Sequence, residues 1–158
     1  MIDTDRDLTL QRVIRAPRER IWTAWTSAAQ LQQWWTPAPA LTRVDQLDVQ
    51  PGGGFVTWMS EDGGEYVPHT DGIFLVVEPF HRLVFTNAVD SQWHPAAPAP
   101  VAMTAEIVLR EHPEGTDYQA IVRHGDPDQR RRHEQLGFFD GWGAVTAALA
   151  AVAESGTR

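Results

Sequence analysis

The residue types in this chain that could carry chemistry are mainly histidines, and their spacing argues against a metal site. The pair His133-Glu134 lacks the second histidine of a zinc-protease helix. The chain has no cysteine, which excludes disulfides, thiol nucleophiles and thiolate ligands. No serine lies in a nucleophile elbow. We therefore expect no metal, no cofactor and no hydrolytic centre. The six histidines are scattered along the chain: His69, His81, His94, His112, His124 and His133.

Two further pairs of polar residues can be interpreted either as functional groups or as ordinary solvent-exposed side chains. His69 and Asp71 lie two apart on a predicted strand, so both should point to one face, as a solvated pair or as ligands. Asp90 and His94 lie in a proline-rich loop, where they either gate a cavity or are simply solvated. Residues 52–54 are all glycine, but no lysine or helix start follows them, so they form a turn and no phosphate loop.

Most of the chain has the alternation of apolar and polar residues that is typical of antiparallel strands. Turn signals separate the segments, and the proline-rich stretch 88–100 should be a long loop. We expect an antiparallel meander after a first strand. The predicted strands cover residues 8–14, 44–49, 55–59, 72–78, 83–86, 101–109 and 118–124.

Two short helices and one long helix complete the predicted elements. Pro17 begins the first helix and Ser27 caps the second, which Pro37 ends. Four of the seven tryptophans lie in this hairpin and should be core rather than ligand contacts. Asp126 begins a final helix that runs to about Glu154, and its glycines indicate a close approach, a bend or a loose stretch. Its predicted inward face contains Phe138, Phe139, Trp142, Val145, Leu149 and Val152.

The alternation also predicts which side chains face this helix. They form a solid core or, alternatively, line an apolar cavity for a small molecule. The best polar candidate is His124, which either orients a ligand carbonyl or hydroxyl or is an exposed histidine at a strand end. The predicted ligand-binding set is Phe55, Thr57, Met59, Ile73, Leu75, Phe85, Met103, Ile107, Val122 and His124 from the sheet, with Phe138, Phe139 and Trp142 from the helix; Leu83 shares their face.

Six segments, in order, resemble the activator of heat shock protein 90 ATPase homologue family, within the SRPBCC (START-like, birch-pollen-allergen-like) superfamily. The resemblance covers about residues 8–153. It implies an α+β helix-grip fold, with a curved antiparallel sheet of about six or seven strands, a short helix hairpin and a long C-terminal helix over a cavity. The segments are Arg12–Pro17, Ile21–Thr26, Trp34–Pro37, Pro51–Gly53, Pro79–Thr86 and Leu136–Trp142.

Length and charge limit the classes of function. The 158 residues fit one domain, 1–158, and a formal net charge of −8 disfavours nucleic acid. The polar N-terminus and the lack of a long apolar stretch predict a cytoplasmic protein without membrane contact. The sequence leaves open whether the chain forms a homodimer.

Three functions remain open. The first is binding of a small hydrophobic molecule. The second is a cyclase/aromatase-like enzyme acting on a polyketide-like substrate, and the third, implied by the family name, is a chaperone-associated interaction protein with a role in stress response. An enzyme needs at least two convergent polar groups. His124 is the only polar group that we predict to lie in the cavity with a possible chemical role. The residues therefore favour binding over catalysis.

Overall fold

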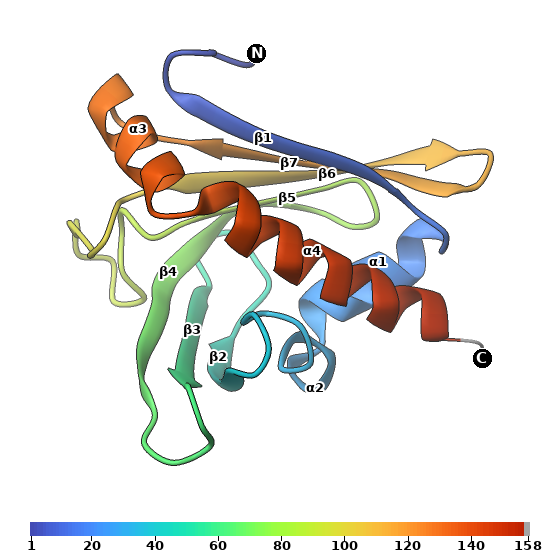
Figure 1. Ribbon diagram of the computed structural model, residues 1–158, viewed down its shortest axis with the longest axis horizontal. Helices are drawn as coiled ribbons and strands as arrows, with labels where there is room; N and C mark the ends of the chain where they lie inside the picture. Colours follow the sequence, from blue (N-terminus) through green and yellow to red (C-terminus); the bar gives the residue numbers. More distant parts are fainter. Residues whose placement is uncertain (157–158) are drawn as a thin grey trace.

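The strands form one antiparallel sheet in a computed structural model that describes residues 1–156 (Figure 1). Seven strands are ordered β1-β7-β6-β5-β4-β3-β2, so β2 to β7 form a meander and β1 pairs with the last strand. The elements are β1 (Asp7–Ile14), α1 (Arg18–Thr26), α2 (Ala28–Leu31), β2 (Leu41–Leu47), β3 (Gly54–Ser60), β4 (Val67–Glu78), β5 (Arg82–Thr86), β6 (Thr104–His112), β7 (Gly115–Arg123), α3 (Pro127–Gln135) and α4 (Phe138–Ser155).

One face of this sheet is covered by α4, which crosses it in Figure 1 and contacts both α1 and β1. An amphipathic helix on one face of an antiparallel sheet buries the apolar side of both elements. The buried residues on the covered face come from all the central strands, and the architecture is the expected α+β helix-grip fold. The core residues of this face include Leu8, Phe55, Phe74, Leu83, Phe85, Ile107, Tyr118 and Val122.

The helix hairpin is attached to the core by its indoles. Ser27 caps α2, since its hydroxyl oxygen accepts from the Gln30 N–H at 3.4 Å. The helix ends at Leu31, earlier than predicted, and Trp34 and Trp35 lie in the turn that follows. Trp34 donates through Nε1 to the carbonyl oxygen of Ala24 at 3.0 Å and is fully buried. The prediction that these tryptophans are core is confirmed for Trp25, Trp34 and Trp35, whereas Trp22 is only partly buried against the core.

A bulge in β4 overturns part of the predicted inward set. The pairing of β4 with β5 shifts between Phe74 and Val76, so Phe74 opposes Phe85 on the covered face. Because adjacent strand residues point to opposite faces, Ile73 lies on the other face. Leu75 is 42% exposed. The predicted inward placement of Ile73 and Leu75 is therefore wrong, and Phe74 takes their place.

The predicted single C-terminal helix is in fact two helices. Asp126 is the N-cap as expected, and its Oδ1 accepts from the Gln129 N–H at 2.8 Å. The helix then breaks at Gly137, where φ is +96°, and α3 and α4 meet at 66°. Of the three predicted roles for the glycines, Gly137 makes a bend. Phe139 is 46% exposed after this break, so its predicted inward placement is wrong.

Membrane-span length and composition can be assessed for residues 1–156. There, no single helix is long and apolar enough to cross a membrane, and only the bent pair α3 and α4 taken together meets both conditions.

Two glycine substitutions test the origin of the bend. A Cβ at Gly137 or Gly143 would meet no atom within 4 Å, so neither alanine variant should clash. Gly137→Ala should still lower the free energy of unfolding by about 1–2 kcal/mol, because an L-residue is strained in the left-handed region. Gly143→Ala, inside α4, should raise it by up to about 1 kcal/mol. Urea unfolding measures both, and equal effects of the two variants would contradict the assigned strain.

Candidate functional site

A pocket of about 250 Å³ opens between α4, strands β4 and β5, and the loop that leads into β6. Its position is where the helix lies over the sheet, and this is the region in which a cavity was expected. Most of its walls are apolar, as is usual for small-molecule sites. The apolar lining consists of Trp35, Pro37, Phe85, Ala99, Pro100, Val101, Met103, Gly141, Trp142 and Val145.

The aromatic walls of the pocket are held by packing on both sides. Trp35 is 8% exposed, and its ring centroid lies 5.3 Å from that of Phe55 and 5.9 Å from that of Phe85. On the helix side, Trp142 stacks on Phe138 at 5.5 Å. Gly141 also lines the pocket, and a Cβ there would meet no atom within 4 Å. The helix therefore leaves space at this position that a larger side chain would fill.

The polar part of the lining begins at a second bulge. The pairing of β3 with β4 shifts between Thr57 and Trp58, which places His69 and Thr70 together at the pocket. The Nδ1 atom of His69 lies 3.2 Å from the Thr57 hydroxyl, and Trp35 donates through Nε1 to Thr70 Oγ1 at 3.0 Å. Surrounding protein atoms displace enough water to lower the pKa of His69, although part of the ring still reaches solvent.

Asn87 shapes the pocket through the loop before β6. Its Oδ1 accepts from the Met103 N–H at 2.8 Å, and its Nδ2 donates to the Val101 carbonyl oxygen at 3.3 Å. One amide side chain thus satisfies two backbone groups of a segment that lies outside the strands. The loop is fastened against the end of β5, and its apolar residues are held at the pocket.

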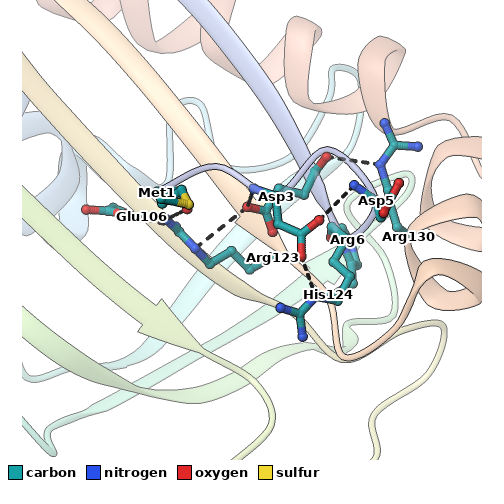
Figure 2. A network of polar contacts seen from close by, with 9 residues as sticks. Met1, Asp3, Asp5, Arg6, Glu106, Arg123, His124 and Arg130 are labelled. Atoms are coloured by element: carbon teal, nitrogen blue, oxygen red, sulfur yellow. Dashed lines mark hydrogen bonds and ion pairs between the residues drawn. The ribbon is translucent and has the colours of Figure 1, made fainter.

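Two histidines are in contact where α3 forms part of the pocket wall. His133 lines the pocket, and its Nδ1 lies 2.8 Å from Nε2 of His124. His124 is 6% exposed, and its Nδ1 lies 2.8 Å from the carbonyl oxygen of Arg6 (Figure 2). The His133 ring also packs edge-on against Phe138 at 5.1 Å. The break at Gly137 makes this possible, because it turns α4 so that Phe138 lies beside His133.

Burial keeps this pair of rings uncharged. Desolvation, followed by the neighbouring His124, lowers the pKa of His133 to about 4. Desolvation is also the largest influence on His124 and lowers its pKa; Arg130 acts in the same direction, and the Arg6 carbonyl and Asp7 oppose it. Both imidazoles are therefore neutral near pH 7.

A network of polar contacts fixes the N-terminal turn that supplies the Arg6 carbonyl (Figure 2). Arg130 donates through Nε to the Asp7 carbonyl oxygen at 3.0 Å, and the Asp3 N–H donates to Asp7 Oδ2 at 2.7 Å. Arg123 pairs with Glu106 at 2.8 Å next to this turn. The carbonyl that holds His124 is thus braced by α3 and by β1.

The structure brings together only part of the predicted ligand-binding set. Phe85, Met103 and Trp142 line the pocket. His124 lies behind His133 and contacts it rather than ending a strand in solvent. Ile73, Leu75 and Phe139 face elsewhere, as described above. The remaining members lie in or beside the core, outside the pocket lining: Phe55, Thr57, Met59, Ile107, Val122 and Phe138.

Several pocket residues were not predicted. Trp35 was assigned to the core, and it lies in the core and at the pocket wall at once. His69 was paired with Asp71 on one face, but the bulge separates them, and Asp71 instead accepts from the Ser91 N–H at 2.8 Å. No feature of the sequence marks Asn87. No feature of the sequence marks His133 either, because five positions along a continuous helix would turn it about 140° away from Phe138.

The other histidine candidates lie elsewhere. Asp90 and His94 are 3.8 Å apart within their own loop and are not among the residues of the pocket. Within residues 1–156, no three His, Asp or Glu side chains gather closely enough to hold a metal ion.

Comparison with known proteins places the chain in a family of this architecture. The model of the AHSA1 family, described as activator of Hsp90 ATPase homolog 1-like protein, matches residues 15–154. A crystal structure of a Nitrosomonas europaea protein is 34% identical, with 99% of each chain covered and a TM-score of 0.90. A Chromobacterium violaceum protein is 24% identical (94% of this chain and 97% of that chain; TM-score 0.75). The AHSA1-like protein of Aeromonas hydrophila is 20% identical (94% and 92%; TM-score 0.71). No curated protein matches significantly.

The neutral histidine pair makes the stability of the fold depend on pH. The unfolded chain takes up a proton on His133 near its ordinary pKa of 6.5, whereas the folded chain does so only at about 4. Stability from this group is therefore complete above pH 6.5 and falls as the pH is lowered toward 4, by about 2 kcal/mol after allowance for partial exposure. His124 adds to the loss in the same direction.

Urea unfolding between about pH 7 and pH 5, above the range where most carboxylates titrate, measures this loss. His133→Asn should have a visibly smaller decline than the native chain. His112→Asn, at the β6–β7 turn away from the pocket, is the matched control and should keep the native decline. An unchanged decline in His133→Asn would show that this ring does not titrate as assigned.

Proposed function

The chain belongs to the AHSA1 family of activator of Hsp90 ATPase homolog 1-like proteins, and from that premise we propose that it binds a small hydrophobic molecule in the pocket between α4 and the sheet. The observation that carries the proposal is an apolar pocket that stays open although its walls are well packed. Trp35, Phe85 and Trp142 present ring surfaces to it, and each is supported by another aromatic ring. Fixed walls favour binding because little side-chain freedom remains to be lost.

The dimensions of the pocket limit the ligand. A volume of about 250 Å³ lies just below the roughly 300–1,000 Å³ of most small-molecule sites. Besides the ten less polar positions, the lining contains four polar side chains: His69, Thr70, Asn87 and His133. The side-chain amide of Asn87 is already hydrogen-bonded to the backbone of the loop. It therefore shapes the pocket rather than offering a hydrogen bond to a ligand. The arrangement fits a molecule of one to three rings with a polar group at one side.

Filling the pocket from α4 tests this function. Gly141→Leu places an aliphatic side chain in the open space, whereas Gly143→Leu places the same side chain on the same helix outside the pocket lining. The probe is the uncharged dye N-phenyl-1-naphthylamine, whose fluorescence rises in apolar surroundings. We expect a Kd on the order of micromolar for the native chain and for Gly143→Leu, and at least about tenfold weaker binding for Gly141→Leu.

Stability measurements accompany this titration. Both variants replace glycine with a good helix former, so neither should lower the free energy of unfolding unless the new side chain clashes. The proposal is contradicted by a native protein that does not bind the dye. It is also contradicted if both leucine variants bind the dye as the native chain does.

A second candidate function, a cyclase/aromatase-like enzyme, is favoured by one observation that the sequence did not predict. His69 and His133 both line the pocket, so more than one group capable of proton transfer is present. Such an enzyme would withdraw a proton next to a carbonyl of its substrate. Deuterium uptake from D2O into the methyl group of 2-acetonaphthone tests this directly. Uptake faster than in buffer, and lost in His133→Asn, would favour the enzyme; uptake equal to buffer would favour binding alone.

A further inference from the structure

The tautomer of His124 is set by the backbone. A carbonyl oxygen can only accept a hydrogen bond, so the 2.8 Å contact between His124 Nδ1 and the Arg6 oxygen requires a proton on Nδ1. A neutral imidazole carries one N–H, and Nε2 of His124 is then without a proton. This atom can only accept.

The same reasoning fixes His133. Its Nδ1 lies 2.8 Å from His124 Nε2, and because that atom accepts, His133 Nδ1 must donate. The proton of His133 is therefore on Nδ1, and its Nε2 has a free lone pair. Within residues 1–156, the contact with His124 is the hydrogen bond that the His133 ring makes, so Nε2 has no protein donor. The three groups form a directed relay from His133 through His124 to the Arg6 carbonyl.

We propose that Nε2 of His133 is a fixed hydrogen-bond acceptor in the pocket, and that the ligand is an apolar ring molecule that carries a hydroxyl group donating to it. This inference rests on the proposed function and specifies the chemistry of its ligand. Nε2 is separated from Nδ1 by Cε1, so its lone pair points in a different direction from the Nδ1–H bond to His124, and His133 is part of the pocket lining. An acceptor without a protein donor among residues 1–156, on a residue of a mostly apolar pocket, rewards a ligand that donates to it and leaves an ether or an alkane without this bond.

The charges around the relay support a neutral pair of rings. Arg130 of α3 lies near His124 and opposes a positive charge on it, while Asp7 of β1 favours one. Burial outweighs the effect of Asp7 at His124 and lowers the pKa of both rings. The N-terminal turn that supplies the Arg6 carbonyl is braced as Figure 2 shows, so the end of the relay does not rotate away.

Two naphthalene probes that differ in one methyl group test the acceptor. 2-Naphthol can donate a hydrogen bond through its hydroxyl, and 2-methoxynaphthalene cannot. We expect the native chain to bind 2-naphthol about 5- to 10-fold more tightly than the methyl ether, as one buried hydrogen bond allows. Both fluoresce, so titrations at about pH 7, where the rings are neutral, measure each Kd directly.

His133→Asn is the informative variant. The asparagine amide nitrogen can take the place of Nδ1 and still donate to His124, but the side chain has no atom at the position of Nε2. This variant should bind both probes with equal affinity, because its affinity for 2-naphthol falls while its affinity for 2-methoxynaphthalene stays the same. His112→Asn, outside the pocket, should keep the native preference. If His133→Asn fails to fold, the tautomer measurement below decides.

Nitrogen-15 NMR of the native chain reads the tautomers without any ligand. Long-range couplings should place the ring protons of His124 and His133 on Nδ1. A proton on Nε2 of His133, or equal affinity of the native chain for the two probes, overturns this inference and leaves the proposed function intact. Failure of both naphthalenes and of the dye to bind would instead overturn the proposed function itself.

Discussion

The packing of Trp35 is the interaction on which the rest of the molecule depends. Its ring contacts Trp25 and Trp34 of the hairpin and Phe55 and Phe85 of the sheet, at centroid distances between 5.3 and 5.9 Å. Its Nε1 donates to Thr70. A single side chain thereby joins the helix hairpin, the sheet and the pocket wall. Aromatic rings in edge contacts have few alternative rotamers, so the wall is set before a ligand arrives.

The break at Gly137 is the second constraint on the pocket. On one continuous helix, His133 and Phe138 would point roughly 140° apart, because each residue turns by about 100°. The left-handed backbone of Gly137 redirects the chain and brings the two ring centroids to 5.1 Å. The same turn sends α4 across the sheet and leaves Phe139 exposed. One residue without a Cβ thus decides both where the histidine pair lies and which face of α4 borders the pocket.

The sequence predicted the order and type of the elements well, because alternation and capping are local signals. Asp126, Ser27 and the glycine turns each act within a few residues of themselves. The register within β4 was not predictable in this way. A bulge adds one residue to one strand, and every side chain beyond it changes face. Ile73 and Leu75 fell on the wrong side of such a shift, and a second bulge hid the role of His69.

The candidate site was less predictable than the fold because its polar groups come from distant segments. His133 owes its state to His124 and, through it, to a backbone carbonyl of the N-terminal turn, 127 positions earlier than His133 in the chain. Neither residue type nor local spacing reveals such a contact. A buried polar relay costs desolvation unless every member is satisfied, and here each atom but one has its partner. That remaining atom belongs to a residue of the pocket lining, and there an incomplete network serves to select a ligand.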